Sequence, residues 1–235
     1  MSHEVDIHPA QTIILRELLF HPSAGFAKLQ KPTGLDSDHF KFHIARLVQL
    51  GYVQKEGNGE YSLTKRGKEY ANRLDTERNT IEKQPKLSVL LVIENNRGEF
   101  LFQERLKQPY FGFWALPTGK ISWGEKVAEA GARELKEETG LVADLRVSGL
   151  QHKIDCNQNT QTLLEDKFFT IIHGTNPTGE LISDMEGHHN EWLTVDQVLQ
   201  KEKVFRSSMV GIINLALEQG FGFLEGTHYY DDQDY

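Results

Sequence analysis

Hydrophobic residues recur at helical spacing through the first fifty positions of the chain. This pattern predicts helices over residues 10–20, 25–30 and 37–50, separated by turn-forming residues. The first and third helices are expected to share a core, and their apolar positions are Ile13, Ile14, Leu18, Phe20, Phe40, Ile44, Leu47 and Val48. Three amphipathic helices therefore open the chain.

The hydrophobic period changes to two after residue 51. Alternation around Gly57 and Gly59 predicts a β-hairpin, which residues 64–74 follow as a further helix. Residues 75–85 are polar and carry no apolar period, so we expect an extension of that helix and then a linker. A domain boundary near residue 82 follows, with domains over residues 1–82 and 83–235.

The second domain is predicted to be an α+β fold. A hairpin over residues 87–105 turns at residues 95–98, and strands follow over residues 143–155 and 164–174. Residues 183–190 are expected to form a polar loop, and helices begin near residues 194 and 209. We expect the acidic tail after Gly226 to be frayed.

Residues 122–140 predict the central helix of this domain, about four turns long. Ser122 and Glu125 form a capping-box pattern at its start, and Gly140 is suited to its end. An apolar stripe is expected to pack on a sheet, and its members are Val127, Ala128, Gly131, Ala132 and Leu135.

Three glutamates crowd the end of this helix. Glu134 and Glu138 are expected along the edge of the apolar stripe, with Glu137 beside them. Like charges four residues apart repel, and anions at a helix C-terminus oppose its dipole, at up to about 1 kcal/mol for each contact. A bound Mg²⁺ or Mn²⁺ would make this unfavourable arrangement favourable, because both ions take oxygen ligands. The alternative is a solvated acidic helix in which Glu129 pairs with Arg133.

The same stretch resembles the Nudix box, Gly-x5-Glu-x7-Arg-Glu-U-x-Glu-Glu-x-Gly-U, in which U is a bulky aliphatic residue. Every position agrees, and the residues are Gly119, Glu125, Arg133, Glu134, Leu135, Glu137, Glu138, Gly140 and Leu141. The resemblance implies an α/β/α sandwich with a mixed sheet. It also implies a Mg²⁺-dependent pyrophosphohydrolase that cleaves a nucleoside diphosphate linked to another group. The family commonly has Pro-Gly-Gly before the box, where this chain has Pro-Thr-Gly.

The resemblance also implies residue roles. Metal ligands are expected at Gly119, Glu134, Glu137 and Glu138, with Arg133 orienting the carboxylates. A further carboxylate would deprotonate the attacking water. Nudix enzymes take this base from the box helix or from a later loop, so Glu138 and the loop residues Asp184 and Glu186 are the candidates.

Substrate contacts are expected just before the box. Arg105 follows a predicted strand where other Nudix chains have an arginine that reaches substrate, although a surface ion pair is the alternative. Phe113 and Trp114, together with Tyr110 and Phe111, either stack on a nucleobase or fill the core. The adjacent His188 and His189 do not predict a zinc site, because consecutive side chains point apart and no third ligand has suitable spacing.

The first domain resembles the winged helix-turn-helix of bacterial transcription regulators, since three helices precede a hairpin. If it binds duplex DNA, the side chains expected at the DNA are Lys41, His43, Arg46 and Lys55. Glu56, Glu60, Asp36 and Asp38 dilute this positive charge, so a protein-binding or dimerisation role stays open.

Composition limits the remaining classes. The 235 residues carry a net charge of −8 and a single cysteine, Cys156, which excludes an internal disulfide. With no long apolar run and no leader pattern, we expect a cytoplasmic protein. We also expect a homodimer. Two functions stay open: a Nudix hydrolase, and a regulator that senses a nucleotide metabolite and binds DNA, with or without hydrolysis.

Overall fold

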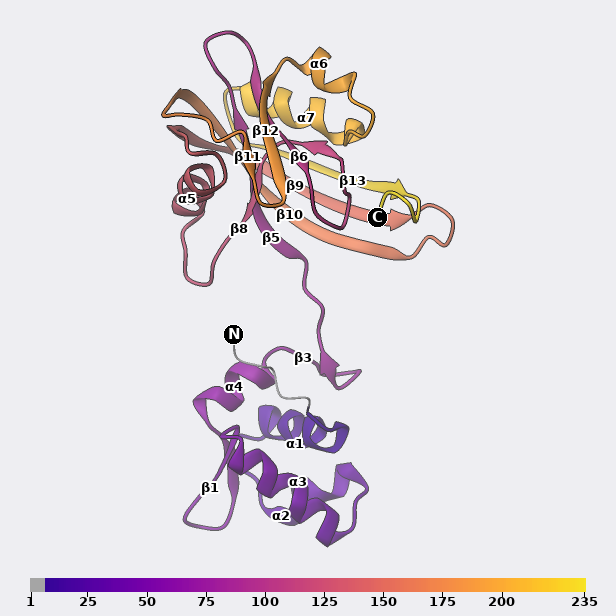
Figure 1. Ribbon diagram of the computed structural model, residues 1–235. Coiled ribbons are helices and arrows are strands. Elements are labelled where there is room, and N and C mark those ends of the chain that lie inside the picture. Colours follow the sequence, from indigo (N-terminus) through magenta and orange to yellow (C-terminus); the bar gives the residue numbers. More distant parts are fainter. Residues whose placement is uncertain (1–6) are drawn as a thin grey trace. The chain divides into compact units, whose positions relative to one another are not determined.

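The chain forms two compact units, Met1–Lys83 and Gln84–Tyr235. The computed structural model describes residues 7–235 (Figure 1). The first six residues of the predicted N-terminal domain lie outside this range. Within residues 7–235, none of the helices combines the length and apolar character needed to cross a membrane.

The N-terminal unit begins with three helices and a short antiparallel hairpin. Its elements are α1 (Pro9–Phe20), α2 (Phe26–Gln30), the 3-10 turn η1 (Lys31–Thr33), α3 (Ser37–Gln49), β1 (Val53–Lys55), β2 (Tyr61–Leu63) and α4 (Lys65–Ala71). Asp36 caps α3 by accepting hydrogen bonds from the backbone of Asp38 and His39. These elements follow the order that the hydrophobic pattern predicts.

Two of the predicted core positions in this unit are wrong. Phe20 is 58% exposed and Val48 is 39% exposed, whereas Leu15 is fully buried. Phe20 lies 200° around α1 from the buried Leu18, because each helical residue turns by 100°. Its side chain therefore points away from the core.

The polar stretch after α4 is a small hairpin rather than a helical extension. Strands β3 (Leu74–Asp75) and β4 (Thr80–Ile81) pair in antiparallel register. The Asp75 carboxylate accepts hydrogen bonds from the backbone N–H groups of Glu77 and Arg78, both at 3.0 Å. This Asx turn reverses the chain, and it competes with a helix for the same backbone donors.

The C-terminal unit contains two sheets and three helices. Its strands are β5 (Lys86–Ile93), β6 (Phe100–Arg105), β7 (Trp114–Ala115), β8 (Thr118–Lys120), β9 (Val142–Asn157), β10 (Leu163–Thr178), β11 (Asp184–Met185), β12 (His188–Leu193) and β13 (Gly222–Tyr230). Its helices are α5 (Val127–Thr139), α6 (Val195–Leu199) and α7 (Arg206–Leu217). The five-stranded sheet has the order β13-β9-β10-β5-β8, and the four-stranded sheet β11-β12-β6-β7.

The five-stranded sheet is mixed and lies between helices. Strand β10 runs parallel to β5 and antiparallel to β9. Leu90 and Val92 of β5 pack in a cluster with α7, whereas Leu91 and Ile93 pack in a cluster with α5. Since successive strand residues face opposite ways, α5 and α7 cover opposite faces of this sheet (Figure 1). The predicted α+β class with a mixed sheet is confirmed.

Strands β5 and β6 do not form the predicted hairpin. The turn at residues 95–98 is present, with Gly98 at a φ of +76°, but only the bridge between Glu94 and Phe100 joins the two strands. Both edges of β5 are already paired, one with β8 and one with β10. Strand β6 therefore pairs with β7 and β12 in the other sheet.

Two segments expected to be irregular are strands. Residues 222–230 form β13, which pairs in parallel with β9 from Gly222 opposite Gly149 to Tyr230 opposite Asn157. Residues 227–230 of the tail expected to be frayed are thus part of the edge strand of the sheet, and residues 231–235 follow it. Residues 184–193 contain the β11–β12 hairpin, which turns at Gly187 with a φ of +88°.

The contact between β9 and β13 predicts the effect of a single methyl group. A Cβ at Gly149 would lie 2.4 Å from the backbone oxygen of Gly222, so Gly149→Ala must push β13 away. We expect it to lower the free energy of unfolding by roughly 1–3 kcal/mol. In α7, a Cβ at Gly211 would meet nothing nearer than 4.0 Å. Gly211→Ala should therefore raise the free energy of unfolding by about 0.5–1 kcal/mol. Urea unfolding of both variants checks this, and equal effects would contradict it.

Candidate functional site

Helix α5 begins later than the sequence predicts. Its first residue is Val127, because Gly124 has a φ of +82° that a right-handed helix does not allow. Ser122 and Glu125 still contact one another, since the backbone N–H of Ser122 donates to the Glu125 carboxylate at 2.9 Å. They form a turn before the helix rather than its cap. The helix ends as predicted, with Gly140 at a φ of +77°.

The buried face of α5 contains an acidic residue. Ala128 and Ala132 are exposed, so the predicted apolar stripe is displaced around the helix. The buried positions are Ala130, Gly131, Glu134, Leu135 and Thr139. Glu134 is 8% exposed and therefore lies within this face rather than along its edge.

Glu134 lies directly against Gly119 of β8. A Cβ at Gly119 would be 2.0 Å from the carboxyl carbon of Glu134, a distance that no side chain tolerates. The glycine that opens the box is therefore required by the close approach of this carboxylate. The contact joins α5 to β8 at the wall of the site.

Arg133 binds three carboxylates at once. Its Nε lies 2.7 Å from Glu125, and its Nη1 lies 2.8 Å from Glu134 and 2.9 Å from Glu137. Hydrogen bonds from Arg133 and from the backbone of Ser122 lower the pKa of Glu125 from 4.5 to about 2. Hydrogen bonds to Glu125, Glu134 and Glu137 raise the pKa of Arg133. Arg133 thus offsets the repulsion among these glutamates.

Glu138 faces His188 of β12. The His188 Nδ1 lies 3.2 Å from the Glu138 carboxylate, although the two are not aligned for a hydrogen bond. The backbone oxygen of Glu138 lies 3.0 Å from His188 Nε2 and accepts a hydrogen bond from Asn190 at 2.8 Å. His188 and Asn190 are both buried, so strand β12 fixes the end of α5.

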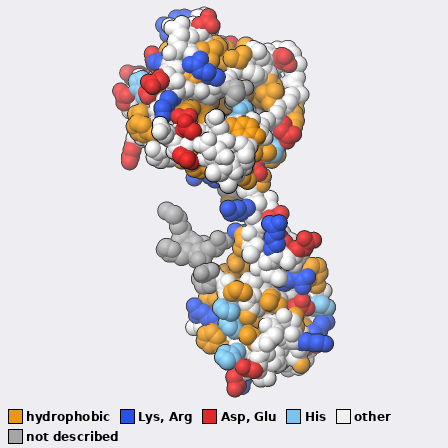
Figure 2. All heavy atoms as spheres, turned by 90° about the vertical axis from the view of Figure 1, so that its right-hand side faces the viewer, with side chains coloured by type: hydrophobic (Ala, Val, Ile, Leu, Met, Phe, Trp, Pro, Cys, Tyr) orange, Lys and Arg blue, Asp and Glu red, His pale blue; other side chains and the backbone are white. Residues whose placement is uncertain are grey.

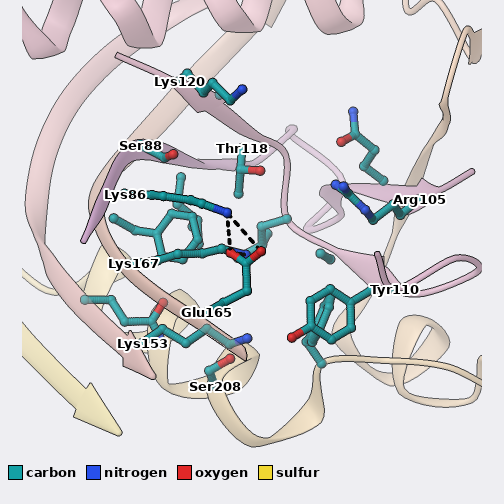
Figure 3. A pocket seen from close by; sticks show the side chains of 18 of the residues that line it. Lys86, Ser88, Arg105, Tyr110, Thr118, Lys120, Lys153, Glu165, Lys167 and Ser208 are labelled. Atoms are coloured by element: carbon teal, nitrogen blue, oxygen red, sulfur yellow. Dashed lines mark hydrogen bonds and ion pairs between the residues drawn. The ribbon is translucent and has the colours of Figure 1, made fainter. Parts of the chain in front are cut away.

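A cavity of about 720 Å³ opens beside these residues. Gly119, Glu134 and Glu138 line one part of it, and the rest of its charged wall is mainly basic (Figure 3). The positively charged lining residues are Lys86, Arg105, Lys107, Lys120, Lys153 and Lys167. Glu165 is the one further carboxylate in the described lining. Such a wall suits a polyanionic ligand.

Comparison with protein families decides the assignment. The model of the NUDIX domain matches residues 84–210, which is more than half of the chain. The chain belongs to the Nudix family. The match falls within the C-terminal unit, which contains the box and the cavity.

Individual Nudix relatives match over shorter stretches. An ADP-ribose pyrophosphatase of Methanocaldococcus jannaschii is 33% identical over 90 residues, which cover 37% of this chain and 53% of that protein. The uncharacterized Nudix hydrolase YvcI of Bacillus subtilis is 28% identical over 126 residues, covering 53% and 77%. This chain spans only about half the length of the archaeal relative.

A solved structure agrees with the fold. The mutator MutT protein of Bacillus halodurans superposes with a TM-score of 0.51 at 19% identity. The match covers 64% of this chain and 93% of the other. At this identity the likeness concerns the Nudix fold alone.

The box does not gather all three of its helix-end glutamates at the cavity. Glu134 and Glu138 line it, whereas the Glu137 side chain is 60% exposed and pairs with Arg133. Across residues 7–235, no three His, Cys, Asp or Glu side chains are grouped as a metal site. In this structure Glu137 thus lies outside the cavity lining, paired with Arg133, and its role as a metal ligand stays a prediction.

The donors that remain fit a hard cation. Glu134 and Glu138 supply carboxylate oxygens, and Gly119 contributes backbone at the same wall. Mg²⁺ commonly takes one or two carboxylates and completes its shell with water and substrate phosphates. Two carboxylates beside an open cavity therefore meet this requirement.

The predicted substrate residues divide between cavity and core. Arg105 lines the cavity and donates to the backbone oxygens of Pro109 and Gln108, and within residues 7–235 it has no ion-pair partner. Phe113 and Trp114 are 5% and 6% exposed and lie in hydrophobic clusters rather than in the cavity wall. The loop candidates Asp184 and Glu186 are exposed and lie outside the cavity lining.

Sequence reasoning missed the basic part of the cavity. Lys86, Lys153, Glu165 and Lys167 come from three strands that are adjacent only in the folded sheet. A signal was present in β9, where four polar residues at alternate positions are buried: Gln151, Lys153, Asp155 and Asn157. A strand face made of polar residues indicates a wall that faces a polar cavity rather than the core.

The Arg133 contacts predict a change in titration. Arg133→Gln should raise the pKa of Glu125 from about 2 toward 4.5, observed by NMR titration of the Glu125 carboxyl carbon. Since the folded pKa is lowered, the stabilisation is present above pH 4.5 and is lost as the pH falls through 2. The stability difference between wild type and Arg133→Gln should shrink over that window.

Lys126→Gln is the matched control for this titration. Lys126 is next to Glu125 in sequence but pairs with Glu129, so the pKa of Glu125 should not move. An unchanged pKa in Arg133→Gln, or an equal change in both variants, would contradict the account.

Proposed function

We propose that this Nudix protein hydrolyses a diphosphate bond in a nucleoside diphosphate linked to another group, and that it requires Mg²⁺. The observation that carries this proposal is the composition of one cavity. Glu134, Glu138 and Gly119 form one part of its wall, and six cationic side chains form much of the rest. Such a division suits a metal-bound diphosphate whose remaining charge contacts lysine and arginine.

The chain's own residues would orient the diphosphate in the cavity. Arg105 and Lys107, at and just after the end of β6, and Lys120 of β8 can donate to phosphoryl oxygens from two segments around the cavity. Bound Mg²⁺, held by the carboxylates of Glu134 and Glu138, would neutralise charge on the phosphates. Fixed donors of this kind stabilise charge that grows on the phosphoryl oxygens during attack by water.

We assign the general base to Glu138, through the carboxylate oxygen that does not contact the metal. It lines the cavity, whereas the loop candidates Asp184 and Glu186 are exposed outside it. A base must lie within hydrogen-bond reach of the proton that it removes. The neighbouring His188 and Asn190 bind the backbone oxygen of Glu138, which supports a fixed position for its side chain.

The substrate assignment stays at the level of a class. The similarity to a protein named ADP-ribose pyrophosphatase makes ADP-ribose the first compound to test. Sugar nucleotides and dinucleoside polyphosphates contain the same diphosphate and belong in the same screen. The cavity volume of about 720 Å³ accommodates ligands of this size.

Replacement of Glu138 tests the assigned base. Glu138→Gln keeps the size of the side chain but cannot accept a proton, so kcat should fall by about 10²–10⁴-fold with Mg²⁺ present. The rate of nucleoside monophosphate release measures it. Glu129→Gln, an exposed carboxylate on the same helix, is the matched control and should keep kcat within about twofold. Full activity of Glu138→Gln would contradict the assignment.

A second candidate function concerns the N-terminal unit. Lys41 and Arg46 are exposed on α3, and Lys55 is exposed on β1. These positions support the hypothesis of duplex binding by a winged helix, in a regulator that also contains the Nudix unit. His43 supports it less, because its ring is half-buried and stacks on His8 at 4.4 Å between centroids.

The mixed surface supports the competing hypothesis of a protein partner. Figure 2 shows one face of the N-terminal unit, on which basic, acidic, histidine and hydrophobic side chains are interspersed. Phe42 of α3 is 67% exposed, which is unusual for a helix that faces phosphates. A homodimer and a cytoplasmic location stay predictions.

Duplex binding is tested by removing two charges from α3. The variant with Lys41→Ala and Arg46→Ala should bind duplex DNA at least tenfold more weakly, with a salt slope smaller by about 2 if both contact phosphates. Fluorescence anisotropy at several salt concentrations measures both. Absence of duplex binding by the wild-type chain at low salt would remove this function and favour a protein partner.

A further inference from the structure

Three lysines form a row across the five-stranded sheet. Lys153 of β9 lies opposite Lys167 of β10, and Lys167 lies opposite Lys86 of β5. Residues in such register share one face of the sheet, with Cβ atoms about 5 Å apart. All three line the cavity, and we call them the lysine row (Figure 3).

The lysine row is electrostatically unfavourable in isolation. Like charges directly opposite each other destabilise a sheet, and burial adds a desolvation penalty. Lys153 is only 7% exposed, and burial lowers the pKa of its ammonium group. An arrangement of this kind needs negative charge close by.

Two carboxylates supply part of that charge. Glu165 lies 3.0 Å from the Lys86 ammonium and 2.9 Å from that of Lys167. The fully buried Asp155 lies 2.8 Å from the Lys153 ammonium. Glu165 is two residues from Lys167 on β10, and Asp155 is two residues from Lys153 on β9, so both acids belong to the same face as the lysine row.

Positive charge remains in excess at this end of the cavity. Arg105 also interacts electrostatically with Glu165, but its guanidinium donates to backbone oxygens, and among residues 7–235 it has no carboxylate within ion-pair distance. The three lysines and Arg105 thus outnumber the two carboxylates.

The lysine row is separate from the box carboxylates. Gly119, which touches Glu134, pairs with Val89 of β5. Lys86 is three residues earlier on the same strand, so its Cα lies roughly 10 Å from that of Val89, and its side chain projects from the opposite face of the sheet. That face also carries Ser88 and Phe169, which line the cavity as well. The lysine row and the box carboxylates therefore reach one cavity from opposite faces of the sheet.

We propose that the lysine row binds a second anionic group of the substrate, apart from the diphosphate that is cleaved. The substrate would then be a nucleoside diphosphate derivative with a further phosphate or carboxylate on one of its moieties. This inference rests on the proposed hydrolysis, and it names the class of substrate for that same cavity.

A purely structural role is the competing explanation. In that case the lysines serve only to neutralise Glu165 and Asp155, and replacing one would affect stability but not discrimination between substrates. Lys86 is the informative position, because its side chain is 65% exposed and contributes little to the core. Lys167→Gln is the second variant, and Arg97→Gln in the exposed turn before β6 is the charge-matched control.

The kinetic test uses pairs of compounds that differ in one anionic group. NADH and NADPH differ by a phosphate, and UDP-glucose and UDP-glucuronate differ by a carboxylate. Wild type should show a lower KM for the more anionic member of at least one pair. Lys86→Gln and Lys167→Gln should raise that KM on the order of tenfold, and the KM of the other member less than twofold. The pair that responds identifies phosphate or carboxylate.

A binding test separates this inference from the proposed hydrolysis. Binding of inorganic phosphate and of citrate to the full chain, measured by calorimetry in EDTA, requires no turnover. Both lysine variants should weaken the binding of one anion severalfold, and Arg97→Gln should not. If wild type hydrolyses none of the compounds but this pattern holds, the hydrolysis proposal fails and the anion site stands. Equal KM changes within each pair, or anion binding that is the same in all variants, would overturn the lysine row as a binding site.

Discussion

The close approach of Glu134 to Gly119 is the constraint on which the C-terminal unit depends. A buried carboxylate lies where a side chain at position 119 would collide with it, so the helix and the strand meet through a glycine. This contact places α5 on the sheet at a fixed depth, and Gly131 repeats it further along, where an added Cβ would lie 2.4 Å from Ile172. Burial of Glu134 is tolerable because Arg133 binds it from the same helix. The acidic end of α5 is thus supported by packing and by one arginine.

The sequence predicted this helix and its chemistry better than its boundaries. Nine spaced residues were enough to indicate the Nudix box, and Gly140 ended the helix as expected. The start was wrong because the pattern of Ser122 and Glu125 also fits a turn, and the φ of Gly124 selects the turn. The exposed position of Glu137 was not predicted, because helical spacing alone does not include its ion pair with Arg133.

Long-range pairing explains the other differences. The turn at residues 95–98 is local and was predicted, whereas the separation of β5 from β6 follows from which strands occupy both edges of β5. The strand β13 was missed because its partner, β9, precedes it by about seventy residues. The lysine row has the same origin: no two of its members are adjacent in sequence, and only the register of three strands brings them together.

Charge in the cavity connects the fold to the proposed activity. Acidic residues from α5 face one region and basic residues from the central sheet face the other, so a metal and a polyanion could be bound together. The most direct test of this account is nucleoside monophosphate release from a panel of nucleoside diphosphate derivatives, by wild type and by Glu134→Gln, with Mg²⁺ and with EDTA. The account predicts Mg²⁺-dependent release by wild type and a loss of at least a hundredfold in the variant. Release that persists in EDTA, or an undiminished rate in Glu134→Gln, would contradict it.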